Sequence, residues 1–137
     1  MDVSDVMAAI GGRLRAIDGL RVYDWPVDDV QEPAAVVDYP AIAYDATFVR
    51  GGDTMTGSVI VVAGLPTDRQ TRTRLGAYCD GTGTASVKAA LQTPAEGETP
   101  AFATLRVTDC EIAPVVFADH TYLGARFNIS ISGKGAS

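Results

Sequence analysis

The first pattern in the chain is an alternation of apolar and polar positions in residues 41–63, which predicts a long β-hairpin. Every second position is apolar in two consecutive runs, Ile42, Tyr44, Ala46 and Phe48, followed by Met55, Val59 and Val61. This period of two is typical of half-buried strands. Between the runs lies a glycine-containing stretch that suits a tight reversal, Arg50, Gly51, Gly52, Asp53 and Thr54. We therefore expect these residues to form the tip of the hairpin.

The last third of the chain predicts a second hairpin over residues 105–131. Its second run is the most regular, with apolar residues at Leu123, Ala125, Phe127, Ile129 and Ile131. In its first run the inward phase passes from Leu105 and Val107 to Cys110 and Ile112. Such a change of phase inside one strand indicates a β-bulge. The turn is expected at Asp119–His120.

Helical spacing of apolar residues predicts a helix over 3–17, a second from Thr67 or Asp68 to about 80, and a short third after Ser86. Asp2 or Ser4 would cap the first helix, in which Gly11 and Gly12 suggest a closely packed partner. Short apolar runs at 20–25 and 34–39 predict strands, the second an edge or short strand because prolines bound it. The prediction is one α+β domain over 1–132, a mainly antiparallel sheet with long hairpins packed against two or three helices. Residues 133–137 are expected to form a flexible tail.

Composition and charge exclude several classes of function. The 137 residues suffice for one core, and a net charge of −6 disfavours wrapping of nucleic acid, which requires surplus Lys and Arg. The apolar runs are far shorter than a membrane span, and the acidic N-terminus differs from a secretory signal, so synthesis in a cytosol is expected. Cys79 and Cys110 lack a CxxC arrangement, so free buried thiols are expected rather than a disulfide.

No stretch of the chain carries a strong catalytic or ligand-binding motif. His120 is the only histidine and falls in a predicted turn, and the acidic stretch with Asp28, Asp29 and Glu32 lacks the spacing of a calcium loop. The glycines of GTGTASVK do not match a phosphate-binding loop. We therefore expect no enzyme activity, no cofactor and no metal. A small ligand-binding or hydrolytic domain that uses Asp28, Asp29 or His120 stays open as an alternative.

Three arginines in the second predicted helix form the only basic cluster. Arg69 and Arg72 share one helix face, whereas Arg74 points away from them. Such a face is either simply solvated or binds carboxylates such as Asp28, Asp29 or Glu111 on another subunit.

Several phrases of the sequence together resemble one known family. They are GLRVYDWPVDDVQEPAAVVDYP at 19–40, AIAYDATFVRGGDTMTGSVIVVAG at 41–64, TDRQTRTRLGAYCDGTGTASVKAALQ at 67–92, LRVTDCE at 105–111 and YLGARFNISI at 122–131. This pattern is similar to the tail terminator proteins of long-tailed bacteriophages, especially those of actinobacteria, also labelled head-to-tail connector or minor tail proteins. The likeness spans nearly the whole chain and departs from the family at the PAEGETPA loop and at the short C-terminal end.

The resemblance implies a structural virion protein of the tail and neck, assembled in the host cytoplasm as a homo-oligomeric ring, typically a hexamer. Such a ring caps the tail tube protein, ends tube polymerisation and joins the head-side connector, while DNA passes through its lumen without specific binding. A head-side stopper or adaptor is the closest alternative. Candidate axial contacts are Asp28, Asp29, Arg50, Gly51, Gly52 and Asp53, and candidate lateral contacts are Arg69, Arg72 and Glu111.

Overall fold

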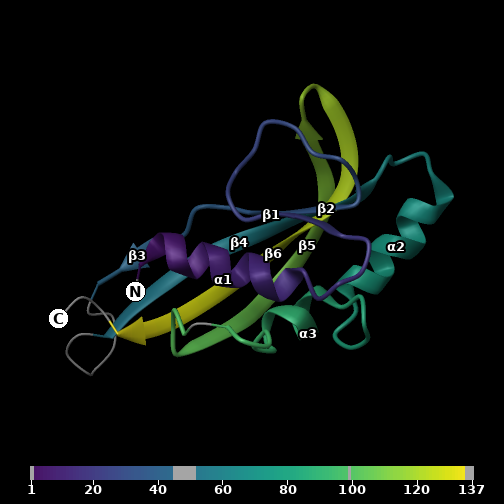
Figure 1. Cartoon of the computed structure of the whole chain (residues 1–137). Coiled ribbons are helices and arrows are strands. Elements are labelled where there is room, and N and C mark those ends of the chain that lie inside the picture. Colours follow the sequence, from purple (N-terminus) through teal and green to yellow (C-terminus); the bar gives the residue numbers. More distant parts are fainter. Residues whose placement is uncertain (1, 45–51, 99, 135–137) are drawn as a thin grey trace.

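Six strands form one mostly antiparallel sheet in the computed structural model, and helices pack on one of its faces (Figure 1). The structure describes residues 2–44, 52–98 and 100–134. Within these ranges the elements are, in chain order, α1 (Val3–Leu14), β1 (Arg21–Tyr23), β2 (Ala34–Val37), β3 (Ala41–Ala43), β4 (Gly52–Gly64), α2 (Arg69–Cys79), α3 (Val87–Leu91), β5 (Thr104–Phe117) and β6 (His120–Lys134). The predicted α+β class is confirmed.

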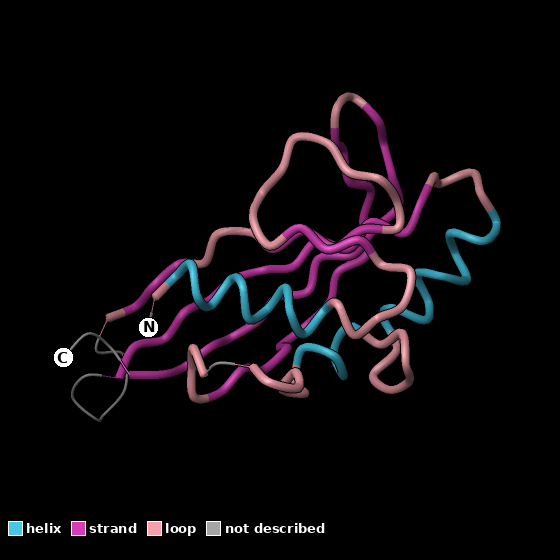
Figure 2. Tube along the Cα trace, in the orientation of Figure 1, coloured by secondary structure: helices cyan, strands magenta, loops and turns pink. Residues whose placement is uncertain are grey.

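The three long strands β4, β6 and β5 are the framework of the sheet. The strand order is β1-β2-β4-β6-β5, and β3 also pairs with β4 (Figure 2). Only the β1–β2 pair is parallel among the described strands. Strand β2 was expected to be an edge or short strand. It is short, and it is not an edge strand, because it lies between β1 and β4 and all of its residues are buried.

The first predicted hairpin is confirmed as the antiparallel pair β3–β4, with Ile42 opposite Met55. Three of the residues expected at its tip are placed differently from the prediction. Gly52 and Asp53 pair with Lys134 and Gly133 of β6, because β4 gains a partner strand there that local sequence does not reveal. Gly52, Asp53 and Thr54 are therefore strand residues rather than turn residues. The other expected tip residues, Arg50 and Gly51, lie outside the described part of the chain.

The second predicted hairpin is confirmed as β5–β6. Ala118 and Asp119 form its turn with φ values of 47° and 63°, one residue earlier than expected, and His120 begins β6. The predicted bulge is present, since the β5–β6 register shifts between Val107 and Asp109. Strand β6 runs on to Lys134, so Gly133 and Lys134 are paired strand residues and not part of a tail.

Helix caps fall where polar residues precede the apolar stripes. The Asp2 side chain accepts a hydrogen bond from the Asp5 backbone N–H at 3.1 Å, and Ser86 Oγ accepts one from Ala89 N–H at 3.1 Å. Helix α1 ends at Leu14, three residues before the predicted end at Ile17. A Cβ at Gly11 would lie 2.8 Å from the Cβ of Asp24, so this glycine allows the chain after β1 to pack closely on α1. Nothing lies that close to Gly12.

Two apolar clusters hold the layers together. The larger lies between the helices and the sheet and contains Val6 and Leu14 of α1, Leu75 of α2 and Phe127 of β6. A smaller cluster lies on the opposite face, where the loop after β1 arches over one end of the sheet (Figure 1). Its buried members are Val30, Ala34, Val36, Val62 and Tyr122. The sheet is thus covered on both faces at one end, and on the helix side along the rest of β4 and β6.

Candidate assembly surfaces

The outer edge of β5 is the most exposed apolar feature of the sheet. Strand β5 ends the strand order, so no described strand pairs with its second edge. Near the β5–β6 turn, Ile112 and Val116 lie on the face of β5 that is turned toward the helices, and they are 57% and 63% exposed. Pro114 lies between them and is also exposed. We call these three residues the β5 tip stripe. Unpaired backbone groups beside exposed apolar side chains are a template for contact with another chain.

The tip stripe also corrects one expectation from the sequence. Cys110 and Ile112 follow the bulge with the predicted inward parity, because they pair with Phe127 and Ala125, which face the helix-side core. Both are nevertheless exposed. Cys110 meets only the end of α2, where the Cys79 sulfur lies 3.6 Å from its own, and beyond this point the β5–β6 hairpin projects past the described helices (Figure 1).

Pro114 limits what can bind at the tip stripe. Proline has no N–H, so a strand added along β5 would lack a donor at this position. The contact expected here is therefore side-chain packing on Ile112 and Val116 rather than a continuous added strand. Leu65, which directly follows the end of β4, is another exposed apolar residue, at 47%.

The candidate axial residues Asp28 and Asp29 are both exposed on the loop that arches over the outer face. Asp29 Oδ1 accepts a hydrogen bond from the Val30 N–H at 2.8 Å, which fixes the loop where Val30 enters the smaller cluster. Burial raises the pKa of the Tyr122 phenol beneath the loop, and the negative charges of Glu32 and Asp29 raise it further. This loop is therefore an anchored acidic surface.

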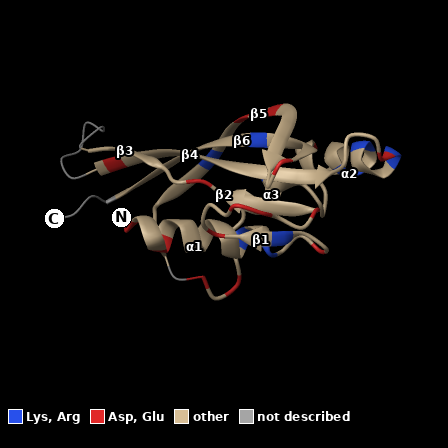
Figure 3. Cartoon of the chain, turned by 90° about the horizontal axis from the view of Figure 1, so that it is seen from above, with Lys and Arg blue, Asp and Glu red and all other residues tan. Residues whose placement is uncertain are grey.

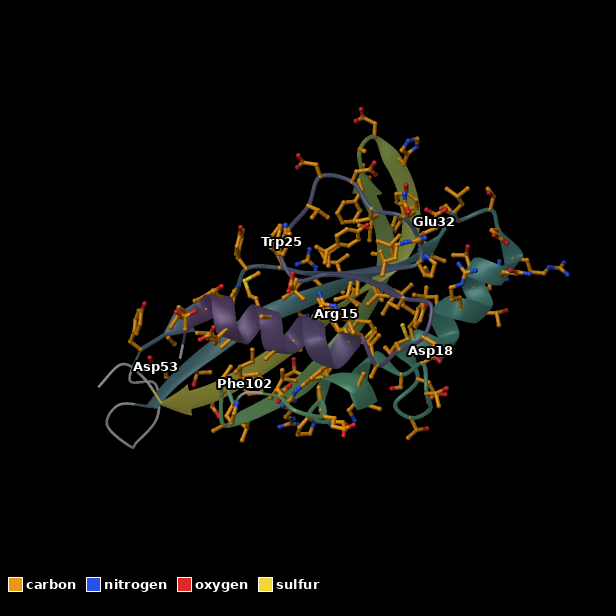
Figure 4. The ribbon with its side chains drawn as sticks, in the orientation of Figure 1. Arg15, Asp18, Trp25, Glu32, Asp53 and Phe102 are labelled. Atoms are coloured by element: carbon orange, nitrogen blue, oxygen red, sulfur yellow. The ribbon has the colours of Figure 1, made fainter. Side chains whose placement is uncertain are left out.

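The candidate axial residue Asp53 is placed differently. It is only 7% exposed, in β4 near the end of the sheet farthest from the β5–β6 turn (Figure 4). Its neighbour Gly52 is likewise held in strand pairing with β6. Neither residue is presented at an exposed tip in the described structure.

The candidate lateral residues Arg69 and Arg72 are exposed on α2, which carries blue basic positions at the far end of the molecule (Figure 3). Arg74 points elsewhere, as predicted, and its Nη1 donates to the Ala63 carbonyl oxygen at 2.6 Å. Arg74 thus joins α2 to the end of β4, and Arg69 and Arg72 are left to face solvent or a partner. The described residues show no ion pair that uses either of these two arginines.

Glu111 lies on the outer face of β5, directly opposite Arg126 of β6 in the register. The two residues line a hollow of about 380 Å³ with Val116 and Pro114. Arg126 Nη1 donates to Ser58 Oγ at 3.2 Å, which holds the guanidinium against the outer face. Glu111 therefore lies beside the tip stripe, whereas Arg69 and Arg72 are on another element of the same chain.

The described residues do not assemble a metal site. His120 is exposed beside the hairpin turn, with its ring centroid 6.3 Å from that of Tyr122. Across residues 2–44, 52–98 and 100–134, no group of three or more His, Cys, Asp or Glu side chains is placed to hold a metal ion. Within the same ranges, no helix is long and apolar enough to span a bilayer.

Sequence reasoning missed one buried charge, Arg13 of α1. Its Nε and Nη2 donate to the two carboxylate oxygens of Glu98 at 2.9 and 3.0 Å, and its Nη1 donates to the Leu91 carbonyl oxygen at 2.7 Å. The guanidinium also lies 4.8 Å from the ring centroid of Phe102, on the loop before β5 (Figure 4). The available signal was a charged residue three positions after Ile10 on the apolar stripe of α1.

Comparison of the chain with models of known protein families and with curated proteins found no match. The likeness to tail terminators is therefore an expectation from the sequence.

Proposed function

We propose that this protein is a non-enzymatic tail terminator subunit, which forms a ring on the tail tube of a long-tailed bacteriophage. In this role it ends tube polymerisation and contributes to the interface that joins head and tail. The proposal starts from the chain-long resemblance and gains support from the surfaces that the fold leaves exposed.

The β5 tip stripe is the observation that carries the proposal. Full burial of a Val or Ile side chain stabilises by about 1.5–3 kcal/mol, so covering the exposed fractions of Ile112 and Val116 is worth about 1–2 kcal/mol for each. In a closed ring every such edge meets the same neighbouring surface, so no subunit keeps a free edge. A closed ring would therefore cover a strand edge that the monomer leaves exposed.

The charged surfaces are suited to directional contacts between copies. Arg69 and Arg72 project from α2, and Glu111 and the Asp28–Asp29 loop lie on other elements. Opposite charges on different parts of one chain favour a head-to-tail arrangement, because the basic face of one copy meets an acidic face of the next.

The net charge supports passage of DNA through the ring. Six copies at −6 each would carry 6 × −6 = −36. Binding to DNA gains free energy when Lys and Arg release counterions from phosphates, and a strongly acidic lumen lacks that gain. Such a ring would let DNA move through without holding it.

The proposal is tested by measuring assembly of tip-stripe variants. Ile112→Lys and Val116→Lys are expected to reduce the ring population by at least tenfold in mass photometry with tail tube protein present, while leaving the monomer folded. Tyr39→Lys is the matched control, since Tyr39 is also an exposed apolar residue, at 67%, but lies outside the tip stripe, in the segment between β2 and β3. Assembly that survives both tip substitutions would refute this use of the edge.

Particles that lack the protein distinguish the terminator from the stopper. Overlong tails are expected for a terminator, because tube polymerisation would lose its stop. Tails of normal length, detached from heads that leak DNA, would instead assign the chain to the head side of the joint.

A further inference from the structure

The two cysteines of the chain lie side by side although they are far apart in the sequence. Cys79 is the last residue of α2 and Cys110 follows the bulge in β5, and their sulfur atoms are 3.6 Å apart. Both were expected to be buried. Cys110 is instead exposed and Cys79 is half-buried, because the helix layer ends at this point of the sheet. Two free thiols at this distance need only a small shift to reach the sulfur–sulfur bond length of about 2.05 Å.

We propose that Cys79 and Cys110 form a redox-sensitive thiol pair, which low-molecular-weight disulfides such as oxidised glutathione convert to an intramolecular disulfide. The Cys110 thiolate attacks one sulfur of the small disulfide and releases one small thiol. Cys79 then loses its proton and attacks the Cys110 sulfur of the mixed disulfide, which releases the second small thiol. The two protein thiols are thus oxidised by two electrons, and the small disulfide is reduced.

The surroundings of the two sulfurs favour this order of steps. Both cysteines line an open hollow of about 500 Å³, which gives a small disulfide access to Cys110. The hollow is also lined by two cations, Lys88 and Arg106, and by one carboxylate, Asp109, so its charged lining has a positive surplus for the carboxylates of oxidised glutathione. Burial, followed by the hydrogen bond and charge of Cys110, raises the pKa of Cys79 to about 12. The exposed Cys110 therefore reacts first.

The same arrangement lets the second step follow. The contributions of Cys110 to the raised pKa of Cys79 end once Cys110 carries an adduct, which makes Cys79 easier to deprotonate. The end of α2 leads into the glycine-containing loop at 81–83, which can take up the shift that bond formation requires. The proximity of the sulfurs makes this step intramolecular and therefore fast relative to a second external attack.

Closure would tie α2 to β5, which are the elements that carry the exposed arginines and the tip stripe. One consequence rests on the proposed function. Subunits would assemble with free thiols in a reducing cytoplasm, and the disulfide would form after the particle reaches oxidising surroundings. The thiol chemistry itself belongs to the isolated chain and does not require a ring.

The test equilibrates the purified, reduced full chain in glutathione buffers of increasing oxidised fraction, followed by acid quenching, alkylation and mass spectrometry. The expected product has lost two hydrogens, carries no glutathione, and yields one peptide pair joined through Cys79 and Cys110. In Cys79→Ser, Cys110 is expected to keep a glutathione adduct. In Cys110→Ser, adduct formation at Cys79 is expected to be at least tenfold slower than at Cys110 in the first variant.

Thermal unfolding gives an independent measurement. The disulfide would close a loop between residues separated by 31 positions, and oxidised wild type is expected to melt roughly 10 °C above reduced wild type. Neither serine variant should gain stability from oxidant. A persistent glutathione adduct on wild-type Cys110, chains joined through Cys110, or no oxidation would each overturn the proposal. Particle mass reports ring formation separately, so the two proposals can fail independently.

Discussion

Replacement of Arg13 by methionine is expected to destabilise the fold far more than an ordinary surface change. Arg13 is 7% exposed and connects α1 to α3 through Leu91 and to the loop before β5 through Glu98 and Phe102. Methionine replaces the aliphatic stem of arginine with an apolar side chain of similar shape and removes the guanidinium. The change therefore isolates the polar contacts more closely than alanine would.

The size of the effect follows from the partners that are left behind. The Leu91 carbonyl oxygen would lose a buried donor, which costs about 1–3 kcal/mol. Loss of the cation–π contact with Phe102 adds about 0.5–1 kcal/mol. The Glu98 side chain is 14% exposed and can regain some water, so losing its partner costs less than the about 3–5 kcal/mol of a fully buried pair. The total is about 3 kcal/mol.

Urea unfolding of the wild type and the variant measures this difference directly. Arg15→Met is the matched control on the same helix, because Arg15 is 54% exposed and its nitrogen is 3.7 Å from Asp24. An exposed pair of this kind contributes at most about 1 kcal/mol. If Arg13→Met and Arg15→Met lose the same free energy of unfolding within about 0.5 kcal/mol, the assigned role of Arg13 is refuted.

Two further predictions concern single residues. The hydrogen bonds from Arg13 hold the pKa of Glu98 below its usual value, so their stabilisation is present above the unfolded pKa and is lost as pH falls through the lower folded value. Wild type should thus lose stability relative to Glu98→Gln in an acid titration followed by circular dichroism, and parallel curves would contradict this. Gly124→Ala should destabilise by more than about 2 kcal/mol because the new Cβ would clash with the Val61 carbonyl oxygen, whereas Gly76→Ala, in open space on α2, should stabilise by about 0.5–1 kcal/mol. Thermal melts of both variants check the opposite signs, and a stable Gly124→Ala would show that the β4–β6 contact can relax.

The periodic parts of the chain were predictable because their signals are local. Apolar alternation in β6 and the phase change after Val107 identify the second hairpin and its bulge. The caps of α1 and α3 follow from single polar residues ahead of apolar stripes. These features depend on neighbours within a few residues, which a sequence displays directly.

The remaining features depend on partners that are distant in sequence. Arg13 and Glu98 are separated by 85 positions, and nothing local indicates that the charge is paired. Alternation placed Cys110 on the correct face of β5, but how far the helices extend over that face depends on tertiary packing. The same reason explains the wrong prediction at Asp53. The neighbouring glycines predict a turn there, whereas pairing with β6, which is distant in sequence, holds Asp53 in a strand.

The proposed function is assembly of subunits into a ring, with no catalysed reaction. Particle mass, measured in the presence of tail tube protein, tests it most directly. The account predicts a closed ring of uniform mass, typically six subunits, that forms with wild type and is lost with Ile112→Lys. A wild-type chain that stays monomeric at every concentration, with and without the tube protein, would contradict it.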